Sequence, residues 1–398
     1  MSFFAIVALP LAINVLQFGA NGNGKVDNTL AFQAALNYAS SHKIGEVDVP
    51  SGNFLFQGQI VIPVGVALKG TWQYVPSHPG LRDQGAPRPN EGGSTFLVEF
   101  GRGLSYNPLG KAITGQAFLN LNSNSLVEGI VIDYPQQVTQ FAPIPYPFSI
   151  SIRGNNAAVK NVELLNSYDG IDATNCARFF IRNVDGQPIH RGVVVDAIYD
   201  IGRIENVHFN PWFSFETPVY KWEMKHGVAF VFGRSDWQYC TNTFCFGYRV
   251  GYQFVATKNG SCNGNFLGIG ADNCTNAVDV RECAPYGLLI TNGEFTSFKG
   301  KNPTEVLVEK SNSGVIHFTN CSFWGPSYQI AHIDGQGTVN FADCTFCDWD
   351  SKHLGLPAIN VVGGKIIIHD CEFQKKGKDI LVGPAVKSSA IHDNLKAQ

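Results

Sequence analysis

The sequence predicts an all-β protein, a right-handed single-stranded parallel β-helix with a short N-terminal capping helix. Three observations support this fold: a repeated phrase, a period-2 alternation within it, and a composition rich in strand and turn formers. The phrase is an Asn or Asp, a small apolar residue, an outward-facing residue and a larger apolar residue. Its copies recur about 22 to 36 residues apart. They begin at Asn161, Asn183, Asn206, Asn320, Asp343 and Asp370, with weaker copies at Asn242, Asn265 and Asn292.

The alternation within each copy indicates strands, because side chains alternate between the two faces of a β-strand. The repeats are rich in Val, Ile, Phe and Thr, which favour strands over helices. The leading Asn suits a tight turn, since Asn tolerates left-handed backbone conformation. Such residues should stack on adjacent coils about 4.8 Å apart. Repeats that cannot bury their apolar face alone are therefore expected to stack as a solenoid.

The composition sets bounds on the class of protein. The 398 residues are 44% hydrophobic and 15% charged, which is ordinary for a globular chain. A net charge of −3 argues against nucleic acid as the partner. Cys321, Cys344 and Cys371 occupy the same inward position of successive coils and predict stacked thiols. One or two disulfides could form within a second group of cysteines, which comprises Cys240, Cys245, Cys262, Cys274 and Cys283. Zinc spacing is missing, so we predict no metal.

The N-terminal region predicts a cap. Residues 1–12 contain an apolar run that is too short to span a bilayer. It has the length of a signal-peptide core but no preceding Lys or Arg, so a signal peptide and a first strand both stay open. Asp27 or Asn28 is expected to cap a short helix. Its apolar face is predicted from Leu30, Ala34, Ala35, Leu36 and Tyr38.

The run from Val15 to Tyr38, followed by Val47-Asp48-Val49-Pro50-Ser51-Gly52-Asn53-Phe54, resembles the opening of the pectate-lyase superfamily. The resemblance is specific over about forty residues and general over the remaining coils. It implies a right-handed parallel β-helix that acts on polysaccharide in an extracellular or periplasmic location. It does not define the reaction, because lyases, hydrolases, epimerases and phage tailspikes share this scaffold.

We expect one domain over residues 1–398, with a cap and first coil at 13–60 and regular coils at 118–382. Loop insertions are predicted at 71–107, 134–147 and 211–225. The last two leave the coil just after the same outward strand. Insertions at one position of a solenoid collect on one face, which is often the binding face.

A first column of candidate residues follows the leading Asn on three successive coils: Glu163, Asp185 and His208. Neighbours should lie about 5 Å apart, a separation that suits paired carboxylates of a glycosidase. Aromatic residues in the flanking insertions predict a wall for stacking sugar rings. They are Tyr146, Trp212, Phe213, Phe215, Tyr220 and Trp222. The alternative is a solvated polar ladder.

A second column lies six residues before the leading Asn and contains Asp200 and Asp236. Stacked carboxylates repel, so one pKa should rise as a general acid requires. Alternatively, Arg203 and Arg234 neutralise them as structural ion pairs. Glu205 and Trp237 are further candidates for substrate binding beside this column, and the two columns are expected to border one cleft.

Asn166-Ser167-Tyr168-Asp169-Gly170-Ile171-Asp172 resembles a polygalacturonase phrase in which an Asp helps to activate water. Asp169 and Asp172 are therefore catalytic candidates by resemblance. The remaining motifs of that site are missing, and Gly186-Gln187-Pro188 stands where its Asp pair is expected. His190, Arg191 and His226 are candidate sugar-carboxylate binders or bases. A lyase of this class would use such a base, and often Ca²⁺ held by clustered acids.

The leading functional prediction is a glycoside hydrolase that uses an acid/base carboxylate pair drawn from Glu163, Asp185, Asp200 and Asp236, with no cofactor. Trp212, Trp222 and Trp237 would stack on sugar rings, while Arg203, Arg234, His190 and His208 would orient the substrate. A polysaccharide lyase is the second prediction, and a non-catalytic glycan-binding or assembly protein is the third. The expected partner is a polysaccharide or oligosaccharide, without nucleic acid or a membrane span; a homo-oligomer stays open.

Overall fold

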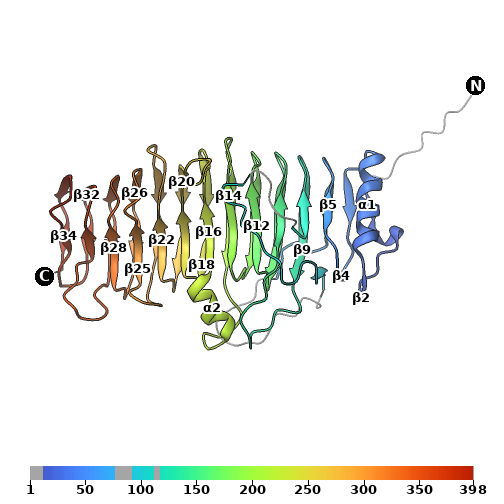
Figure 1. Ribbon diagram of the computed structural model, residues 1–398, viewed down its shortest axis with the longest axis horizontal. Coiled ribbons are helices and arrows are strands. Elements are labelled where there is room, and N and C mark those ends of the chain that lie inside the picture. The colour runs from blue at the N-terminus through green and yellow to red at the C-terminus, as the bar shows by residue number, and fades with distance from the viewer. Residues whose placement is uncertain (1–11, 77–91, 112–116, 398) are drawn as a thin grey trace, which may run out of the picture.

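A computed structural model describes residues 12–76, 92–111 and 117–397 and confirms the predicted parallel β-helix. Its strands form a long sheet of 24 strands and a short sheet of 12, and all their pairings are parallel. Figure 1 shows the coils side by side along one axis, with α1 (Thr29–Ser41) at the N-terminal end. The predicted first strand or signal peptide falls on residues that lie almost wholly outside the described ranges.

The short sheet consists of β5 (Ile60–Ile62), β8 (Leu119–Leu121), β10 (Phe148–Ile152), β12 (Asp169–Thr174), β14 (Arg191–Asp196), β16 (Val228–Phe232), β19 (Val250–Phe254), β22 (Asn276–Val280), β25 (Thr304–Val308), β28 (Gln329–Ile333), β31 (Ile359–Val361) and β34 (Ile380–Val382). The first half of the long sheet consists of β1 (Ile13–Asn14), β2 (Asn23–Asp27), β3 (Glu46–Asp48), β4 (Gly52–Phe56), β6 (Ala67–Lys69), β7 (Ser94–Val98), β9 (Leu126–Asp133), β11 (Ala158–Leu165), β13 (Phe180–Gly186), β15 (Arg203–Phe209), β17 (Gln238–Thr241) and β18 (Phe244–Phe246). The remainder consists of β20 (Gly264–Leu267), β21 (Gly270–Asp272), β23 (Leu288–Thr291), β24 (Glu294–Phe295), β26 (Val315–Thr319), β27 (Ser322–Phe323), β29 (Thr338–Ala342), β30 (Thr345–Phe346), β32 (Lys365–His369), β33 (Glu372–Phe373), β35 (Ser388–His392) and β36 (Leu395–Lys396).

Each regular coil runs along a short-sheet strand, crosses to the long sheet, bends once within it and returns. The bend falls on the leading Asn of the repeated phrase. Asn161, Asn183 and Asn206 have φ of 51°, 52° and 50°, so the predicted left-handed turn is confirmed. In one coil the prediction is wrong: Asn265 lies inside β20, and Gly268 with φ of 62° makes the bend. Gly adopts this conformation without steric cost, so the coil needs no Asn there.

The N-terminal cap is α1, whose apolar face covers the first coils. The prediction of its apolar residues is only partly right, because Ala35 and Leu36 are buried whereas Leu30, Ala34 and Tyr38 are exposed. The buried face is instead completed by Phe32 and Ala39. Asn28 is the N-cap residue but forms no side-chain cap bond. Asp27 Oδ1 accepts a hydrogen bond from the Thr29 backbone N–H at 3.0 Å and satisfies one helix-end donor in its place.

Three long connections leave the coil from one corner, between a long-sheet strand and the next short-sheet strand. They follow β7, β9 and β15, and the last contains α2 (Pro218–His226). Figure 1 shows α2 projecting beside the coils at this edge. The predicted insertion at 71–107 is not one continuous loop, because β7 lies inside it and pairs with β4 and β9. This strand was hidden among Pro, Gly and Asn residues.

The interior is apolar, and nine of the ten cysteines are buried as free thiols. Cys321, Cys344 and Cys371 are buried and lie in register, as predicted. All ten cysteines, each within the described ranges, are free, so the disulfides considered for residues 240–283 do not form. Aromatic rings stack in the same way from coil to coil; Phe318 and Phe341 have ring centroids 5.0 Å apart. Such ladders follow from the parallel register, which places equivalent side chains above one another.

Candidate functional site

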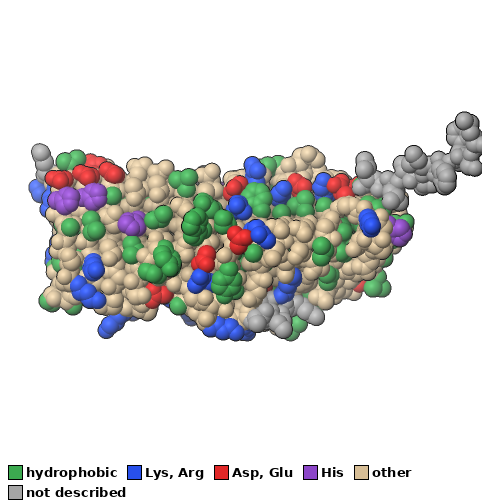
Figure 2. Space-filling model, turned by 90° about the horizontal axis from the view of Figure 1, so that it is seen from above, with side chains coloured by type: hydrophobic (Ala, Val, Ile, Leu, Met, Phe, Trp, Pro, Cys, Tyr) green, Lys and Arg blue, Asp and Glu red, His purple; other side chains and the backbone are tan. Residues whose placement is uncertain are grey.

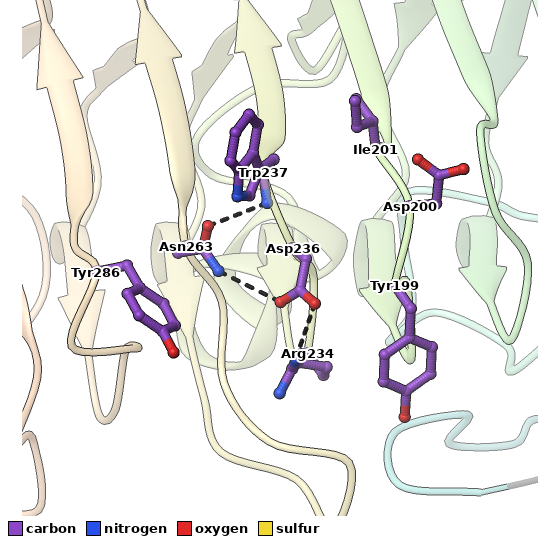
Figure 3. A pocket seen from close by; sticks show the side chains of 8 residues that line it. All are labelled: Tyr199, Asp200, Ile201, Arg234, Asp236, Trp237, Asn263 and Tyr286. Atoms are coloured by element: carbon purple, nitrogen blue, oxygen red, sulfur yellow. Dashed lines mark hydrogen bonds and ion pairs between the residues drawn. The ribbon is translucent and has the colours of Figure 1, made fainter.

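The main candidate site is a cleft with a volume of about 640 Å³. We call it the aromatic cleft, and it is lined by Tyr199, Asp200, Ile201, Arg234, Asp236, Trp237, Asn263 and Tyr286 (Figure 3). Its volume falls in the range typical of ligand sites, about 300–1,000 Å³. Asp200 and Asp236 form the predicted second column, Arg234 and Trp237 were predicted beside it, and the cleft brings the four together.

The cleft is built from the segments that connect short-sheet strands to long-sheet strands on four successive coils. These segments follow β14, β16, β19 and β22. Backbone hydrogen bonds hold them together: Asp236 N–H donates to Ile198 O at 2.9 Å, and Asn263 N–H donates to Ser235 O at 3.0 Å. Four coils at about 4.8 Å spacing give the cleft a length of roughly 15–20 Å. An elongated cleft of this kind fits a chain-like ligand.

Two residues of the cleft have left-handed backbone conformation without being Gly, Asn or Asp. Trp237 has φ of 52° and Ile201 has φ of 21°. Such conformations cost about 1–3 kcal/mol each and cluster at functional sites. In Trp237 the conformation accompanies an indole that is 66% exposed. The equivalent residues of the two preceding coils, Asn156 and Arg178, have φ of 58° and 52°, so this conformation belongs to the corner of the coil and does not by itself mark a site.

Charged groups in the cleft are paired. Arg234 Nη2 lies 2.7 Å from Asp236 Oδ2, and Asn263 Nδ2 donates to Asp236 Oδ1 at 3.3 Å. The hydrogen bond to Asp236 raises the pKa of Arg234. Figure 3 shows Asp236 turned toward Arg234 and Asn263, while Asp200 points away from it. The two carboxylates are therefore in one cleft but not in contact.

The partner of Asp200 differs from the prediction. Arg178 on the preceding coil lies 3.0 Å from Asp200, whereas Arg203 does not line the cleft. Glu205 is likewise outside the cleft and lies 3.9 Å from Arg182. Arg203 and Glu205 sit on β15, whose first residues follow the cleft in sequence and turn their side chains along the outer face of the sheet. The expectation that they bind substrate there is not supported by their position.

Three exposed aromatic side chains line the cleft. Tyr199, Trp237 and Tyr286 are 61%, 66% and 82% exposed. Arg234 stacks over the Tyr199 ring at 5.4 Å. Figure 2, which looks onto the strand ends where the cleft lies, shows hydrophobic, acidic and basic side chains gathered near the middle of the face. Exposed aromatic rings next to paired charges are suited to the apolar faces and hydroxyl groups of sugars.

The first column has the predicted register but not the predicted exposure. Glu163 pairs with Asp185, and Asp185 with His208, on adjacent strands. However, Glu163 and Asp185 are buried, and His208 alone is exposed. Burial, followed by the charge of Glu163, raises the pKa of the nearby Asp133 to about 7. The column lies on β11, β13 and β15, about one strand length from Asp200 and Asp236, so the two columns do not border one cleft.

Trp212 and Trp222 were predicted to form sugar-stacking walls, but neither lines the aromatic cleft. Trp212 Nε1 donates to Asn166 Oδ1 at 2.8 Å, which fastens the insertion onto the coils. Trp222 on α2 packs on Tyr168 and His226, with ring centroids 5.7 and 4.7 Å away. Both are partly buried because the insertion folds back onto the solenoid.

The two carboxylates of the polygalacturonase-like phrase are buried in fixed networks. Asp169 accepts hydrogen bonds from Arg191 at 2.8 and 2.6 Å, and His190 Nδ1 lies 3.0 Å from it. Asp172 accepts from Tyr106, Ser151 and Thr174. Burial raises the pKa of Asp172. These contacts orient neighbouring groups, and neither carboxylate lines a cavity described here.

A second hollow, which we call the basic pocket, has a volume of about 400 Å³. It is lined by Ser105, Tyr106, Asn107, Leu109, His190, Arg191, His226, Val228, Val231, Arg249 and Gln253. It lies at the start of β14 and β16, beneath the connection after β7 and beside the end of α2. The aromatic cleft lies beyond the other end of the same strands, about 20 Å away for six residues of strand.

Sequence reasoning missed several lining residues. Tyr199, Asn263 and Tyr286 stand outside the repeated phrase, and Arg249 and Gln253 belong to a coil that carries no conspicuous motif. The spacing of Asp200 and Asp236 was a usable signal, because residues at the same distance before the next bends reach the same face. Over the described ranges, no group of three or more His, Cys, Asp or Glu side chains could hold a metal ion. Calcium for a lyase stays a prediction.

Comparison with known proteins finds similarity to pectate lyase-like proteins at the N-terminal end of the chain. Residues 12–87 match the family described as rhamnogalacturonase A/epimerase, pectate lyase-like, which confirms the resemblance inferred from the first coil. No curated protein sequence was found to match the chain. In the described residues, no helix has the length and apolar character needed to cross a membrane.

Solved structures with this fold include gene product 12 of bacteriophage phi29. Its N-terminal fragment has a TM-score of 0.68 at 13% identity, over 96% of this chain and 66% of that one. The pre-mature form of the same protein has a TM-score of 0.58 at 11% identity, and this chain spans 52% of its length. A family 28 exopolygalacturonase from Yersinia enterocolitica has a TM-score of 0.54 at 11% identity, over 98% of this chain and 79% of that one. At such identities the likeness shows the fold alone.

Proposed function

We propose that the protein binds a polysaccharide in the aromatic cleft. The observation that carries the proposal is that three exposed aromatic rings and the Arg234–Asp236 pair line one elongated cleft across four coils. The rings offer stacking surfaces for sugars, and the paired charges offer fixed donors and acceptors for hydroxyl groups. Because each of the three rings is more than half exposed, each has a face available to a ligand.

The test is binding of the full chain to a panel of neutral polysaccharides (dextran, xylan) and acidic ones (polygalacturonate, alginate). Trp237→Ala is expected to weaken the best binder about tenfold or more, because buried aromatic anchors dominate binding energy. Trp324→Ala is the matched control, since Trp324 is also half-exposed but lies outside the cleft. Absence of binding to every glycan, or equal losses in both variants, would overturn the proposal.

Glycoside hydrolysis is the second candidate function. It is favoured by one observation, that Asp200 and Asp236 of neighbouring coils line the same cleft. Against it, each carboxylate has an arginine partner, whereas a general acid must carry a proton. Binding therefore follows from the geometry more directly than cleavage does.

Hydrolysis is tested by reducing-sugar release from the glycan that binds best. If the second candidate is right, Asp236→Asn and Asp200→Asn each lower the rate about a hundredfold or more, while the dissociation constant changes little. Activity that persists in both variants would contradict a carboxylate mechanism in the cleft. Loss of binding together with activity would indicate a binding role for the carboxylates.

β-Elimination on a uronate glycan is a less favoured alternative, because neither a histidine nor a lysine of the described ranges lines the aromatic cleft to act as its base. It predicts unsaturated product that absorbs at about 235 nm, without a need for Asp200 or Asp236. An extracellular or periplasmic location is also proposed only from the resemblance. The ten free thiols are more usual in a reducing compartment.

A further inference from the structure

We propose that the basic pocket binds an oxyanion, of the kind that a uronate carboxylate or a sulfate or phosphate ester presents. The proposal concerns a site separate from the aromatic cleft, and it stands or falls independently of polysaccharide binding there. No residue lines both hollows.

The lining residues set the charge of the pocket. Two arginines and two histidines line it, and no Asp or Glu is among the eleven lining residues. By contrast, the smaller set around the aromatic cleft includes two carboxylates. A hollow that presents cations without a carboxylate on its own surface attracts anions.

The charge of Arg191 is already neutralised by Asp169, and its side chain forms a fixed wall of the pocket. Its guanidinium donates to Asp169, to the Tyr106 carbonyl at 2.6 Å and to Asn107 Oδ1 at 3.3 Å. It also packs over the Phe148 ring at 4.8 Å. These bonds hold the connection after β7 over the short sheet and place Ser105 and Asn107 at the rim. Arg191 therefore shapes the site, and its charge is not free for a ligand.

Arg249 is the arginine of the pocket that forms no ion pair within the described ranges. Among the described residues, no carboxylate lies within ion-pair distance of its guanidinium. The acid whose charge acts most strongly on Arg249 is Asp279. Asp279 itself forms an ion pair with Arg281 at 3.2 Å and accepts a hydrogen bond from Gln253 at 2.8 Å. Burial lowers the pKa of Arg249; the charge of Asp279 opposes this shift, and the charge of Arg281 adds to it. A half-buried guanidinium without a partner is costly, and an anion in the pocket would supply that partner.

The pKa of His226 indicates the same positive surroundings. It is the last residue of α2 and lies at the rim with an exposed ring. Burial lowers the pKa of His226, and Lys225, His190 and Arg249 lower it further. The ring of Trp222 packs against it from α2 itself. An anion between His226 and Arg249 would oppose these positive charges and raise the pKa of His226.

The donors around the pocket suit an oxyanion better than a neutral sugar. They comprise the Arg249 guanidinium, the imidazoles of His190 and His226, and the side chains of Ser105 and Asn107. Charge-assisted hydrogen bonds are roughly twice as strong as neutral ones. A neutral sugar would leave the Arg249 charge unpaired. We therefore expect the basic pocket to select its ligand by negative charge more than by shape.

The test is calorimetric titration of the full chain with sodium sulfate, inorganic phosphate, glucuronate and glucose. Saturable binding of at least one anion, and no binding of glucose, is the expected result. Tighter binding of glucuronate assigns the pocket to a uronate carboxylate, and tighter binding of sulfate or phosphate assigns it to an ester. Binding of no anion, or of glucose as tightly as of glucuronate, would overturn the proposal.

Arg249→Gln is expected to lower the anion affinity about tenfold or more, and Arg249→Lys to retain part of it. Lys221→Gln is the control, because it removes a positive charge from α2 at an exposed position that does not line the pocket. An independent readout is the His226 ring by NMR, whose pKa should rise when the anion is added. An Arg249→Gln variant that folds normally and binds as tightly as the native protein would refute the site. So would a His226 pKa that is unchanged by saturating anion.

Discussion

Carboxylates at the two ends of the short-sheet strands behave as two different populations. At the end covered by insertions, Asp133, Glu163 and Asp169 are buried, and Asp169 is fixed by Arg191. At the other end, Asp200 and Asp236 are partly exposed, and each has one arginine partner. The same coil register produces both sets. The difference shows that access to solvent, and not register, decides which stacked acids can meet a ligand.

The largest effect is expected from a substitution that removes the partner of a buried carboxylate. Arg191→Leu would leave Asp169 buried without its bidentate partner, and should lower the free energy of unfolding by about 3–5 kcal/mol. Urea unfolding would measure it. The double change Arg191→Leu with Asp169→Leu should restore part of the loss, because no buried charge then stays unpaired. A loss below about 1 kcal/mol in the single variant would mean that Asp169 finds water or another partner.

The second largest effect is the pH dependence of stability that the buried Asp133 produces. Asp133 has a folded pKa of about 7, raised by burial and Glu163, against about 3.9 when unfolded. The folded state therefore binds the extra proton between these values, so this group's stabilising contribution is lost as pH rises from about 4 to about 7. Asp133→Asn should be more stable than the native protein by about 1–3 kcal/mol at pH 8 and nearly equal at pH 4.

Unfolding by urea at both pH values would check this second expectation. Asp200→Asn is the matched control from the exposed set, and it should change the unfolding free energy by less than about 0.5 kcal/mol at either pH. An Asp133→Asn variant that is no more stable at pH 8 than at pH 4, relative to the native protein, would place Asp133 in a better solvated environment.

The smallest effect concerns the exposed set alone. Arg178→Gln removes the ion pair with Asp200, in which both side chains are about half exposed. It should change the free energy of unfolding by no more than about 0.5 kcal/mol. Thermal or urea unfolding would show it. A loss of 2 kcal/mol or more would mean that this surface pair is far less solvated than its exposure indicates, and the contrast between the two ends would weaken.

Some of the candidate site followed from counting residues along the repeat. The register of Glu163, Asp185 and His208 was predicted, as was the shared cleft of Asp200 and Asp236. Exposure was not, because it depends on where long insertions fold back. Trp212 and Trp222 were expected in a sugar-binding wall, and instead they fasten an insertion onto the coils. The Arg178 partner of Asp200 was missed because it comes from the preceding coil.

The sequence by itself determined the parallel β-helix, its left-handed bends and the order in which side chains stack. It could do so because a period-2 strand pattern, repeated with a turn-forming residue, has one way to bury its apolar positions. Only the tertiary structure decided which stacked groups are covered, which charge pairs with which, and where two hollows open on opposite ends of one sheet. Those features depend on loops and side-chain directions, whose contacts lie between residues that no local pattern connects.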